Sequence, residues 1–188
     1  MDQEYQRQLD IYDENEQIIG RATRAEIHRA GLLHREVHVW FYTPQGEVIF
    51  QHRAPNKDTY PDLLDATVGG HVEIGDNYLD SAIKETEEET GLKLRATDLK
   101  FVVKNRRCSK DELSNTVNNC WGEVYAYCFS GSLSDLRPEA GKGIGFEAWS
   151  IEKLLNITSE EKKLFIHYWF ELENQGIFTR LAKIIKKG

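Results

Sequence analysis

Small and apolar residues recur between positions 78 and 90 with the spacing of an α-helix. The recurring positions, at offsets 0, 3, 4, 7 and 11, are Leu79, Ala82, Ile83, Thr86 and Thr90. At about 100° per residue they share one stripe, which is typical of a helix face that packs on a core. Asn77 before the segment and Gly91 after it are residue types that commonly cap helices. The pattern therefore predicts a helix over residues 78–90.

Apolar runs rich in β-branched and aromatic residues predict a set of strands in the rest of the chain. They cover residues 9–12, 17–20, 37–42, 48–53, 64–68, 99–104, 123–129 and 145–150. Polar turns join the first four into two hairpins, the second of them around Gly46, and a polar stretch separates the strands 99–104 and 123–129. Hairpins mixed irregularly with helices predict an α/β (α+β) fold with a mixed sheet covered by helices.

Further helices are expected on both sides of these strands. A short helix over residues 23–30 should end at Gly31, and another short helix should follow the last strand. Thr158 and Glu161 form a capping-box pattern, which predicts that an amphipathic helix begins there and continues over residues 160–174.

The chain shows no internal repeat and no glycine- or serine-rich linker, so one domain over residues 1–188 is expected. Its parts are an N-terminal hairpin and short helix (1–33), a core (34–157) and C-terminal helices (158–188), the last of them in the tail LAKIIKKG.

The composition narrows the classes of partner. Lys and Arg total 24 against 31 Asp and Glu, so the formal net charge is −7. An acidic protein is a poor candidate for nucleic-acid binding, which needs a basic surface, and it fits anionic membranes poorly. No apolar run approaches the roughly 18 residues of a spanning helix, and no signal peptide is expected. The cysteines, Cys108, Cys120 and Cys128, lack metal or redox spacing, so reduced thiols in a cytoplasmic protein are expected.

Glutamates on the predicted helix converge on a face different from its core stripe. They are Glu85, Glu88 and Glu89, at offsets 0, 3 and 4. Like charges at these spacings repel by a few tenths of a kcal/mol per pair. Two interpretations stay open: a solvated acidic face, or a site for a hard cation such as Mg²⁺ (or Mn²⁺), which prefers carboxylate oxygens and is often completed by substrate phosphates. The preceding Gly69, Gly70 and Gly75 would let a loop approach an ion closely, although a plain strand-to-helix turn also explains them.

Together these residues resemble the signature of the Nudix superfamily, G-x5-E-x7-R-E-U-x-E-E-x-G-U, in which U is a bulky aliphatic residue. The matching positions are Gly70, Glu85, Glu88, Glu89, Gly91 and Leu92. Asp76, Lys84 and Thr86 depart from the signature, although Asp76 and Lys84 keep the charges that a loop-to-helix salt bridge needs. The resemblance implies an α/β/α sandwich and the metal-dependent hydrolysis of a diphosphate linked to another group.

By the same resemblance, the metal ligands are the carboxylates of Glu85, Glu88 and Glu89 and the carbonyl of Gly70. Divalent metals neutralise a phosphoryl centre, orient it and acidify the attacking water. One of these glutamates, or another carboxylate of the site, would act as general base, and Glu139 and Glu147 are candidates from a later loop. No motif identifies the group linked to the diphosphate, so the expected partner is a small-molecule diphosphate of unspecified kind.

A wider resemblance, from about residue 8 to 155, is to the Nudix branch related to type I isopentenyl-diphosphate isomerases. In those isomerases histidines and glutamates hold a metal, while a Cys and a Glu transfer protons. His34 and His71 stand at two of the histidine positions and His28 lies near a third, although ordinary structural roles also explain them. Gly69 stands at the position of the catalytic Cys, and no thiol is expected nearby because every cysteine comes later in the sequence.

The other isomerase positions match incompletely. Glu123 corresponds to the catalytic Glu, but Trp121 then replaces a ligand Glu. These differences favour a hydrolase over an isomerase. A non-catalytic diphosphate-binding module is the third interpretation, and its usual sign, the loss of the helix glutamates, is absent.

Residues outside the signature are candidates for substrate contacts. They are Arg53, Lys57, Tyr60, His71 and Trp121, each with the alternative of an ordinary surface or structural role. His38 is expected to be an ordinary structural histidine, and Trp40, Trp149 and Trp169 are expected in the core. The terminal hairpin and helices would either cap the core or form a homodimer.

Overall fold

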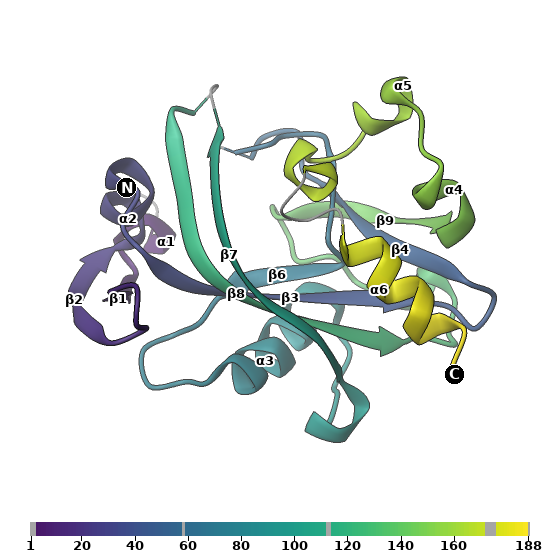
Figure 1. Cartoon of the computed structure of the whole chain (residues 1–188), viewed down its shortest axis with the longest axis horizontal. Coiled ribbons are helices and arrows are strands. Elements are labelled where there is room, and N and C mark those ends of the chain that lie inside the picture. Colours follow the sequence, from purple (N-terminus) through teal and green to yellow (C-terminus); the bar gives the residue numbers. More distant parts are fainter. Residues whose placement is uncertain (1–2, 58, 112–113, 172–175, 188) are drawn as a thin grey trace.

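The computed structural model describes residues 3–57, 59–111, 114–171 and 176–187, with the elements drawn in Figure 1. The N-terminal elements are α1 (Gln3–Gln6), β1 (Gln8–Tyr12), β2 (Ile18–Thr23) and α2 (Arg24–Ala30). The central elements are β3 (His34–Tyr42), β4 (Glu47–Arg53), β5 (Leu64–Asp65), β6 (Val68–His71), α3 (Tyr78–Thr90), β7 (Lys100–Asp111), β8 (Thr116–Cys128) and β9 (Gly143–Ser150). The C-terminal helices are α4 (Ile151–Leu155), α5 (Ser159–Lys162) and α6 (Gly176–Ile185), and short 3₁₀ turns are η1 (Ala96–Asp98), η2 (Leu133–Asp135) and η3 (His167–Phe170).

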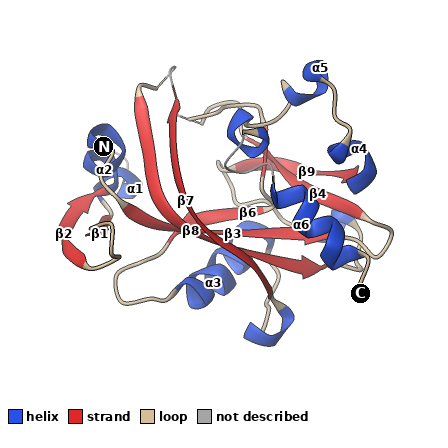
Figure 2. Cartoon of the chain, viewed as in Figure 1, coloured by secondary structure: helices blue, strands red, loops and turns tan. Residues whose placement is uncertain are grey.

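Strand β3 is the centre of the main sheet. It pairs in parallel with β8 along its whole length, and antiparallel with β6 and with the start of β4. Strand β4 pairs antiparallel with β5 and β9, and β7 pairs antiparallel with β8. The sheet is therefore mixed, as the sequence predicts. The predicted N-terminal hairpin forms a separate sheet, β1–β2, which lies beside α1 and α2 at one end of the molecule (Figure 2).

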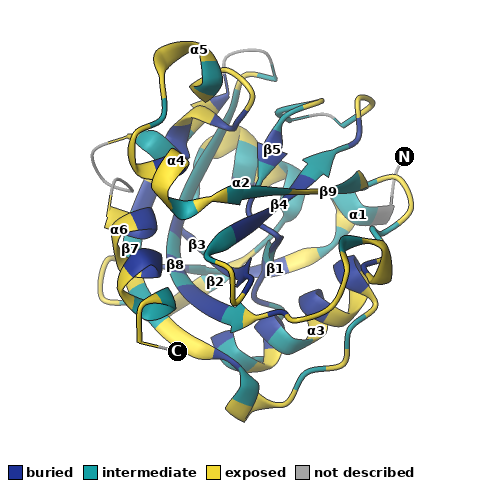
Figure 3. Cartoon of the chain, turned by 90° about the vertical axis from the view of Figure 1, so that its right-hand side faces the viewer, coloured by how far each residue is buried: buried dark blue, intermediate teal, exposed yellow. Residues whose placement is uncertain are grey.

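Side chains of β3 alternate between the two faces of the sheet, and helices cover both faces. Val37, Val39 and Phe41 pack against the side of α3, whereas Trp40 and Tyr42 pack against α4, α6 and η3 on the opposite side. Figure 3 shows the buried interior between these layers. The α/β/α sandwich expected from the resemblance is confirmed.

Helix α3 spans the predicted residues because its two ends carry the predicted caps. The side chain of Asn77 accepts a hydrogen bond from the Asp80 N–H at 3.0 Å, and Gly91 adopts a left-handed φ of 75° while its N–H bonds to the Glu87 carbonyl. Left-handed backbone favours glycine because it has no Cβ. Across the described part of the chain, no helix has both the length and the apolarity to cross a membrane.

The predicted strand 64–68 is wrong in one respect, because the chain crosses from one neighbour to another within it. Strand β5 pairs with β4, whereas β6 pairs with β3. At the crossing, the buried Thr67 hydroxyl accepts a hydrogen bond from the Phe41 N–H at 2.9 Å and donates one to the Ile49 carbonyl. Strand pairing then resumes, so Gly69 and Gly70 lie inside β6 and not in a loop.

The polar stretch expected between the strands 99–104 and 123–129 is itself part of a long hairpin. β7 and β8 stay paired from Lys100 and Ala126 to Asp111 and Thr116. Hydrophobic alternation does not signal this extension, because its inward side chains, such as Arg107 and Asn118, are polar and bury against other polar groups.

The amphipathic helix predicted over residues 160–174 is also wrong. The capping box at Thr158 forms, but α5 ends at Lys162. A turn follows, and Phe165 then forms an isolated parallel bridge with Leu64 before η3 begins. The Leu64 N–H bonds to the Leu164 carbonyl at 2.8 Å, and the Ile166 N–H bonds back to the Leu64 carbonyl at 3.0 Å. Burial against the sheet thus overrides the helical pattern, and the last predicted residues, 172–174, lie outside the described residues. The predicted C-terminal helix is present as α6.

Candidate active site and metal centre

A cavity of about 230 Å³ opens between the main sheet, helix α3 and the N-terminal elements. Its lining includes Arg53, Lys57, Gly70, His71, Glu85 and Glu89, which are predicted site residues. Residues from α1, α2 and the far end of the β7–β8 hairpin, together with residues 57, 59 and 60, complete it. Segments distant in the sequence therefore converge on one space that contains both acidic and basic side chains.

Helix α3 brings two carboxylates against the glycines of β6. Glu85 and Glu89 lie one helical turn apart, and each is 4% exposed. A Cβ at Gly70 would lie 2.1 Å from the Glu85 carboxyl carbon, so a side chain larger than hydrogen would displace the carboxylate. The Gly69 N–H donates to Glu89 Oε2 at 3.1 Å, and the Gln51 amide does so at 3.5 Å.

Burial makes the ionised form of both carboxylates unfavourable, and nearby positive charge offsets this only in part. Burial, followed by the charge of Glu89, raises the pKa of Glu85 to about 8. Burial also raises the pKa of Glu89 to about 7, although Lys142 and the Gly69 N–H act in the opposite direction. Among the described residues, Glu85 Oε2 has no hydrogen-bond partner. Converging buried carboxylates with an unused oxygen fit a divalent cation, because such an ion supplies the missing positive charge.

Glu88 has a different position from its two neighbours. It is exposed and is not among the residues that line the cavity. Of the three predicted glutamates, the structure therefore brings Glu85 and Glu89 together at the cavity and leaves Glu88 on the solvent-exposed side of α3. The neighbouring Lys84 bonds to Glu73, so the link between helix and preceding segment is made by Glu73 and not by Asp76.

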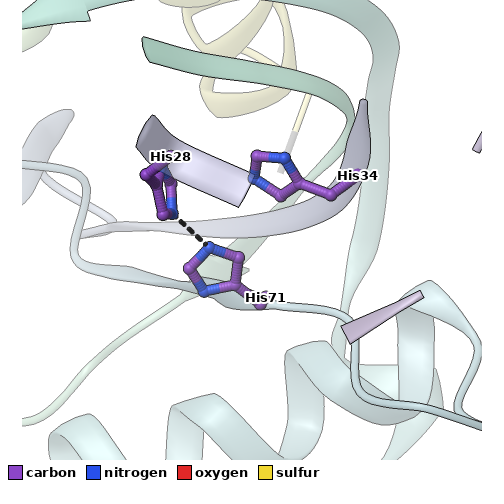
Figure 4. Close-up of side chains that lie close together, drawn as sticks. All are labelled: His28, His34 and His71. Atoms are coloured by element: carbon purple, nitrogen blue, oxygen red, sulfur yellow. Dashed lines mark hydrogen bonds between the residues drawn. The ribbon is translucent and has the colours of Figure 1, made fainter. Parts of the chain in front are cut away.

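A second group of possible ligands lies where α2, β3 and β6 meet (Figure 4). His28, His34 and His71 offer nitrogen atoms that all lie within 4.8 Å of one another. The Nε2 atoms of His28 and His71 are 3.0 Å apart, and the Leu32 carbonyl accepts from Nδ1 of His34 at 3.0 Å. Burial lowers the pKa of His28 to about 4 and that of His71 well below its usual range. Neutral imidazole is the form that binds metals.

Next to these histidines, Glu36 of β3 is buried in a polar network. Its carboxylate accepts hydrogen bonds from Arg107 at 3.1 Å, from Asn118 at 3.0 Å and from the Cys120 thiol at 3.2 Å. Burial opposes the charge of Glu36, but His34 and Arg107 hold the pKa of its carboxyl well below the usual range. Sequence reasoning missed Glu36, although a charged residue directly before the apolar run of residues 37–42 is itself a signal.

The position of Cys120 corrects the expectation that no thiol lies near the glycine segment. Parallel pairing of β3 with β8 places Cys120 opposite His34, and Glu36 links the thiol to His71, whose Nε2 lies 3.7 Å from Glu36 Oε1. The thiol is nevertheless fully buried, does not line the cavity, and has a pKa raised by burial. It serves as a hydrogen-bond donor to Glu36.

Arg53 organises the loop beside the cavity. Its guanidinium donates to the carbonyls of Tyr60 at 3.1 Å and Thr59 at 2.7 Å, and to Asp65 at 3.1 Å. Tyr60 and Asp62 both adopt positive φ, which is uncommon for residues with a side chain. These bonds hold the strained loop, and with it Lys57 and Tyr60, at the cavity wall.

Trp121 and Glu123 are not brought to the cavity. Successive side chains on a strand point to opposite faces, and both share the face of Tyr125, which packs in the cluster under α3. The Glu123 carboxylate accepts a hydrogen bond from the Tyr125 hydroxyl at 2.6 Å. Of the two later carboxylates, Glu139 forms an ion pair with Lys142 at 2.8 Å, whereas Glu147 lies in β9 beside His52, outside the cavity lining. Among the expected core tryptophans, Trp40 and Trp169 are fully buried and Trp149 packs beside them.

Comparison with known proteins gives the family context. The NUDIX domain model matches residues 32–169. An uncharacterized Nudix hydrolase of Clostridium acetobutylicum is 27% identical over 184 residues, which cover 95% of this chain and 87% of that protein. An uncharacterized Nudix hydrolase of Yersinia pestis is 32% identical over 131 residues, which cover 70% of this chain and 67% of that protein. A crystal structure from Deinococcus radiodurans shares the fold, with a TM-score of 0.65 and 18% identity over 96% of this chain and 98% of that one.

Replacing Gly70 by alanine tests whether the absent side chain creates the cation site. The added Cβ would displace the flexible Glu85 carboxylate and leave the fold intact. We expect Gly70→Ala to keep a folded circular-dichroism spectrum but to lose the rise in melting temperature that Mg²⁺ gives the unaltered protein. Gly145→Ala is the matched control, because a Cβ there meets no atom within 4 Å. An undiminished Mg²⁺ response in Gly70→Ala would show that the ion binds elsewhere.

The raised pKa values of Glu85, about 8, and Glu89, about 7, predict the pH dependence of stability. A group whose pKa is higher in the folded than in the unfolded protein adds stability below the unfolded pKa, and this stability is lost as pH rises through the folded pKa. The free energy of unfolding of the metal-free protein should therefore fall between about pH 4.5 and pH 8, and Mg²⁺ should restore it at the alkaline end. Urea denaturation at a series of pH values across this range, with and without Mg²⁺, measures the free energy of unfolding. In Glu85→Gln/Glu89→Gln the fall should largely disappear; an identical fall in that variant would contradict the assignment.

Proposed function

The chain belongs to the NUDIX domain family, and on that basis we propose that it hydrolyses a diphosphate linkage in a small organic molecule with Mg²⁺ or Mn²⁺ as cofactor. The observation that carries the proposal is the buried pair Glu85 and Glu89, which face one cavity across the glycines of β6. The chain retains these acidic residues at a cost in folding stability, which a bound cation would offset.

The proposed ligands of this cation are the carboxylates of Glu85 and Glu89 and the carbonyl of Gly70. Glu88 is also a proposed ligand, on the signature alone, since its side chain is exposed at the edge of α3. When bound, a divalent cation neutralises the charge of the diphosphate and acidifies the attacking water.

The remaining steps fall to the chain's own residues. A general base must lie within reach of the attacking water, and Glu85 and Glu89 both face the cavity, so we propose one of them as general base. Lys57 lines the same cavity and is proposed to contact phosphate oxygens. Arg53 contributes indirectly, because its donors to Thr59 and Tyr60 hold the loop that carries Lys57.

The histidine cluster favours a second metal position over proton transfer. His28 and His71 stay neutral at physiological pH because burial lowers the pKa of each. We propose that they and His34 bind one divalent ion, as the resemblance to the isomerase branch implies, with Glu36 beside it.

Isomerase chemistry is not favoured. Gly69 stands at the position that carries the catalytic Cys in the isomerases, so this chain has no thiol there. Cys120 cannot replace it, because that thiol is buried behind Glu36. A purely binding module is disfavoured because Glu85 and Glu89 both reach the cavity. A cytoplasmic location, the absence of nucleic-acid partners and a homodimer stay predictions.

Phosphorus NMR with a panel of diphosphates tests the proposed reaction. The panel contains dinucleoside polyphosphates, ADP-ribose, nucleoside triphosphates, prenyl diphosphates and a sugar nucleotide, each with Mg²⁺ and then with EDTA. We expect Mg²⁺-dependent cleavage of at least one compound, and ¹⁸O from labelled water in a phosphate product. Glu85→Gln and Glu89→Gln should each lower turnover by about 10²-fold or more, the scale of losing one group that stabilises the transition state.

Glu87→Gln is the matched control, because Glu87 is an exposed glutamate of the same helix that pairs with Lys93. Its turnover should stay near that of the unaltered protein. Glu88→Gln decides between a ligand and a surface residue: a large loss supports the signature, and full activity assigns Glu88 to the surface. Turnover in EDTA, or full turnover in both Glu85→Gln and Glu89→Gln, would contradict the proposed function.

A further inference from the structure

Lys142 supplies a positive charge at the proposed cation site. Its ammonium lies 3.7 Å from Glu89 Oε1 and lines the same cavity. The pKa of Lys142 is raised, since the charge of Glu89 and the hydrogen bond to Glu139 outweigh the effect of burial. Lys142 therefore balances, within the protein itself, part of the charge that a divalent ion would balance.

Hydrogen bonds hold the backbone of Lys142 in place, while its side chain lies near two carboxylates, those of Glu89 and Glu139. The Lys142 carbonyl accepts the Ala54 N–H at 2.9 Å, and its N–H donates to the Glu139 carbonyl at 3.0 Å, immediately before β9. The Lys142 side chain is 26% exposed, and its ammonium also pairs with the Glu139 carboxylate at 2.8 Å. It can therefore leave Glu89 by rotation of its side chain, without any change in the strand.

A divalent ion held by Glu89 would repel an ammonium group at this distance, because like charges close together in a site of low dielectric interact strongly. A diphosphate in the cavity reverses this preference, since its oxygens attract the same ammonium. Because the cation repels the Lys142 ammonium and the substrate attracts it, movement of this one side chain couples binding of the cation to binding of the substrate.

We propose that Lys142 is the counter-ion of Glu89 in the metal-free protein and becomes a ligand of the substrate phosphate when a divalent ion takes its place. This inference rests on the proposed function, because it needs the cation site at Glu85 and Glu89. It makes binding of the ion and of the diphosphate cooperative: the ion binds weakly to the free protein and more tightly once substrate draws Lys142 away from the carboxylate.

The test measures Mn²⁺ binding by electron paramagnetic resonance of the free ion, without substrate, near pH 8. The relevant binding is the component that Glu89→Gln abolishes. Lys142→Met removes the competing charge and should tighten this component by about tenfold, within the usual range for coupling between sites. Lys142→Arg should stay close to the unaltered protein. Lys163→Met is the matched control, because that lysine is exposed and pairs with Glu160.

A second readout uses methylene diphosphonate, which cannot be hydrolysed, at saturating Mn²⁺. Lys142→Met should bind it about tenfold more weakly although its Mn²⁺ binding is stronger, a combination that a merely structural loss would not produce. Mn²⁺ affinity in Lys142→Met that is equal to or weaker than that of the unaltered protein would overturn the proposal. If no Mn²⁺ component depends on Glu89, the proposed cation site fails as well, so the two failures are distinguishable.

Discussion

The site depends on the close approach of helix α3 to the glycines of strand β6. A side chain at Gly70 would collide with the Glu85 carboxyl group, and one at Gly69 would crowd His38. With no side chain at Gly70, the helix packs directly on the sheet and carries Glu85 and Glu89 out of water. Acids buried in this way lose their hydration, so the arrangement is stable only with hydrogen-bond donors, protons or cations nearby. Close packing of α3 on β6 thus buries two acidic groups, and the surrounding residues must supply the hydrogen-bond donors or positive charge that they need.

Those surrounding residues divide the cavity into two ends. At the carboxylate end, the Gly69 N–H and the Lys142 ammonium face Glu89. At the histidine end, the buried Glu36 is satisfied by donors from the β7–β8 hairpin. His28 of α2 and His71 of β6 line the cavity there, whereas the fully buried His34 of β3 does not. Adjacent residues of β6, Gly70 and His71, belong to opposite ends, so one short strand connects the two clusters.

Much of this could be predicted from the sequence where the signals are local. Helix α3 begins and ends as predicted because its periodicity and both caps agree, and the signature located Glu85 and Glu89 before their burial was known. Long-range contacts were not accessible. The segment after α5 follows its hydrogen bonds to Leu64 of β5 and not its helical pattern. The hairpin β7–β8 carries polar side chains inward, and Lys142 reaches Glu89 across more than fifty residues of chain. The exposure of Glu88 was missed because helical spacing alone groups it with its neighbours.

The most direct measurement of the central claim is anomalous X-ray diffraction from crystals of the protein soaked in Mn²⁺. The account predicts an anomalous peak within bonding distance of the Glu85 and Glu89 carboxylates and the Gly70 carbonyl, and loss of that peak in crystals of Glu89→Gln. A peak at His28, His34 and His71 with none at the carboxylate pair would contradict it, because the buried acids would then have a role other than binding the catalytic ion.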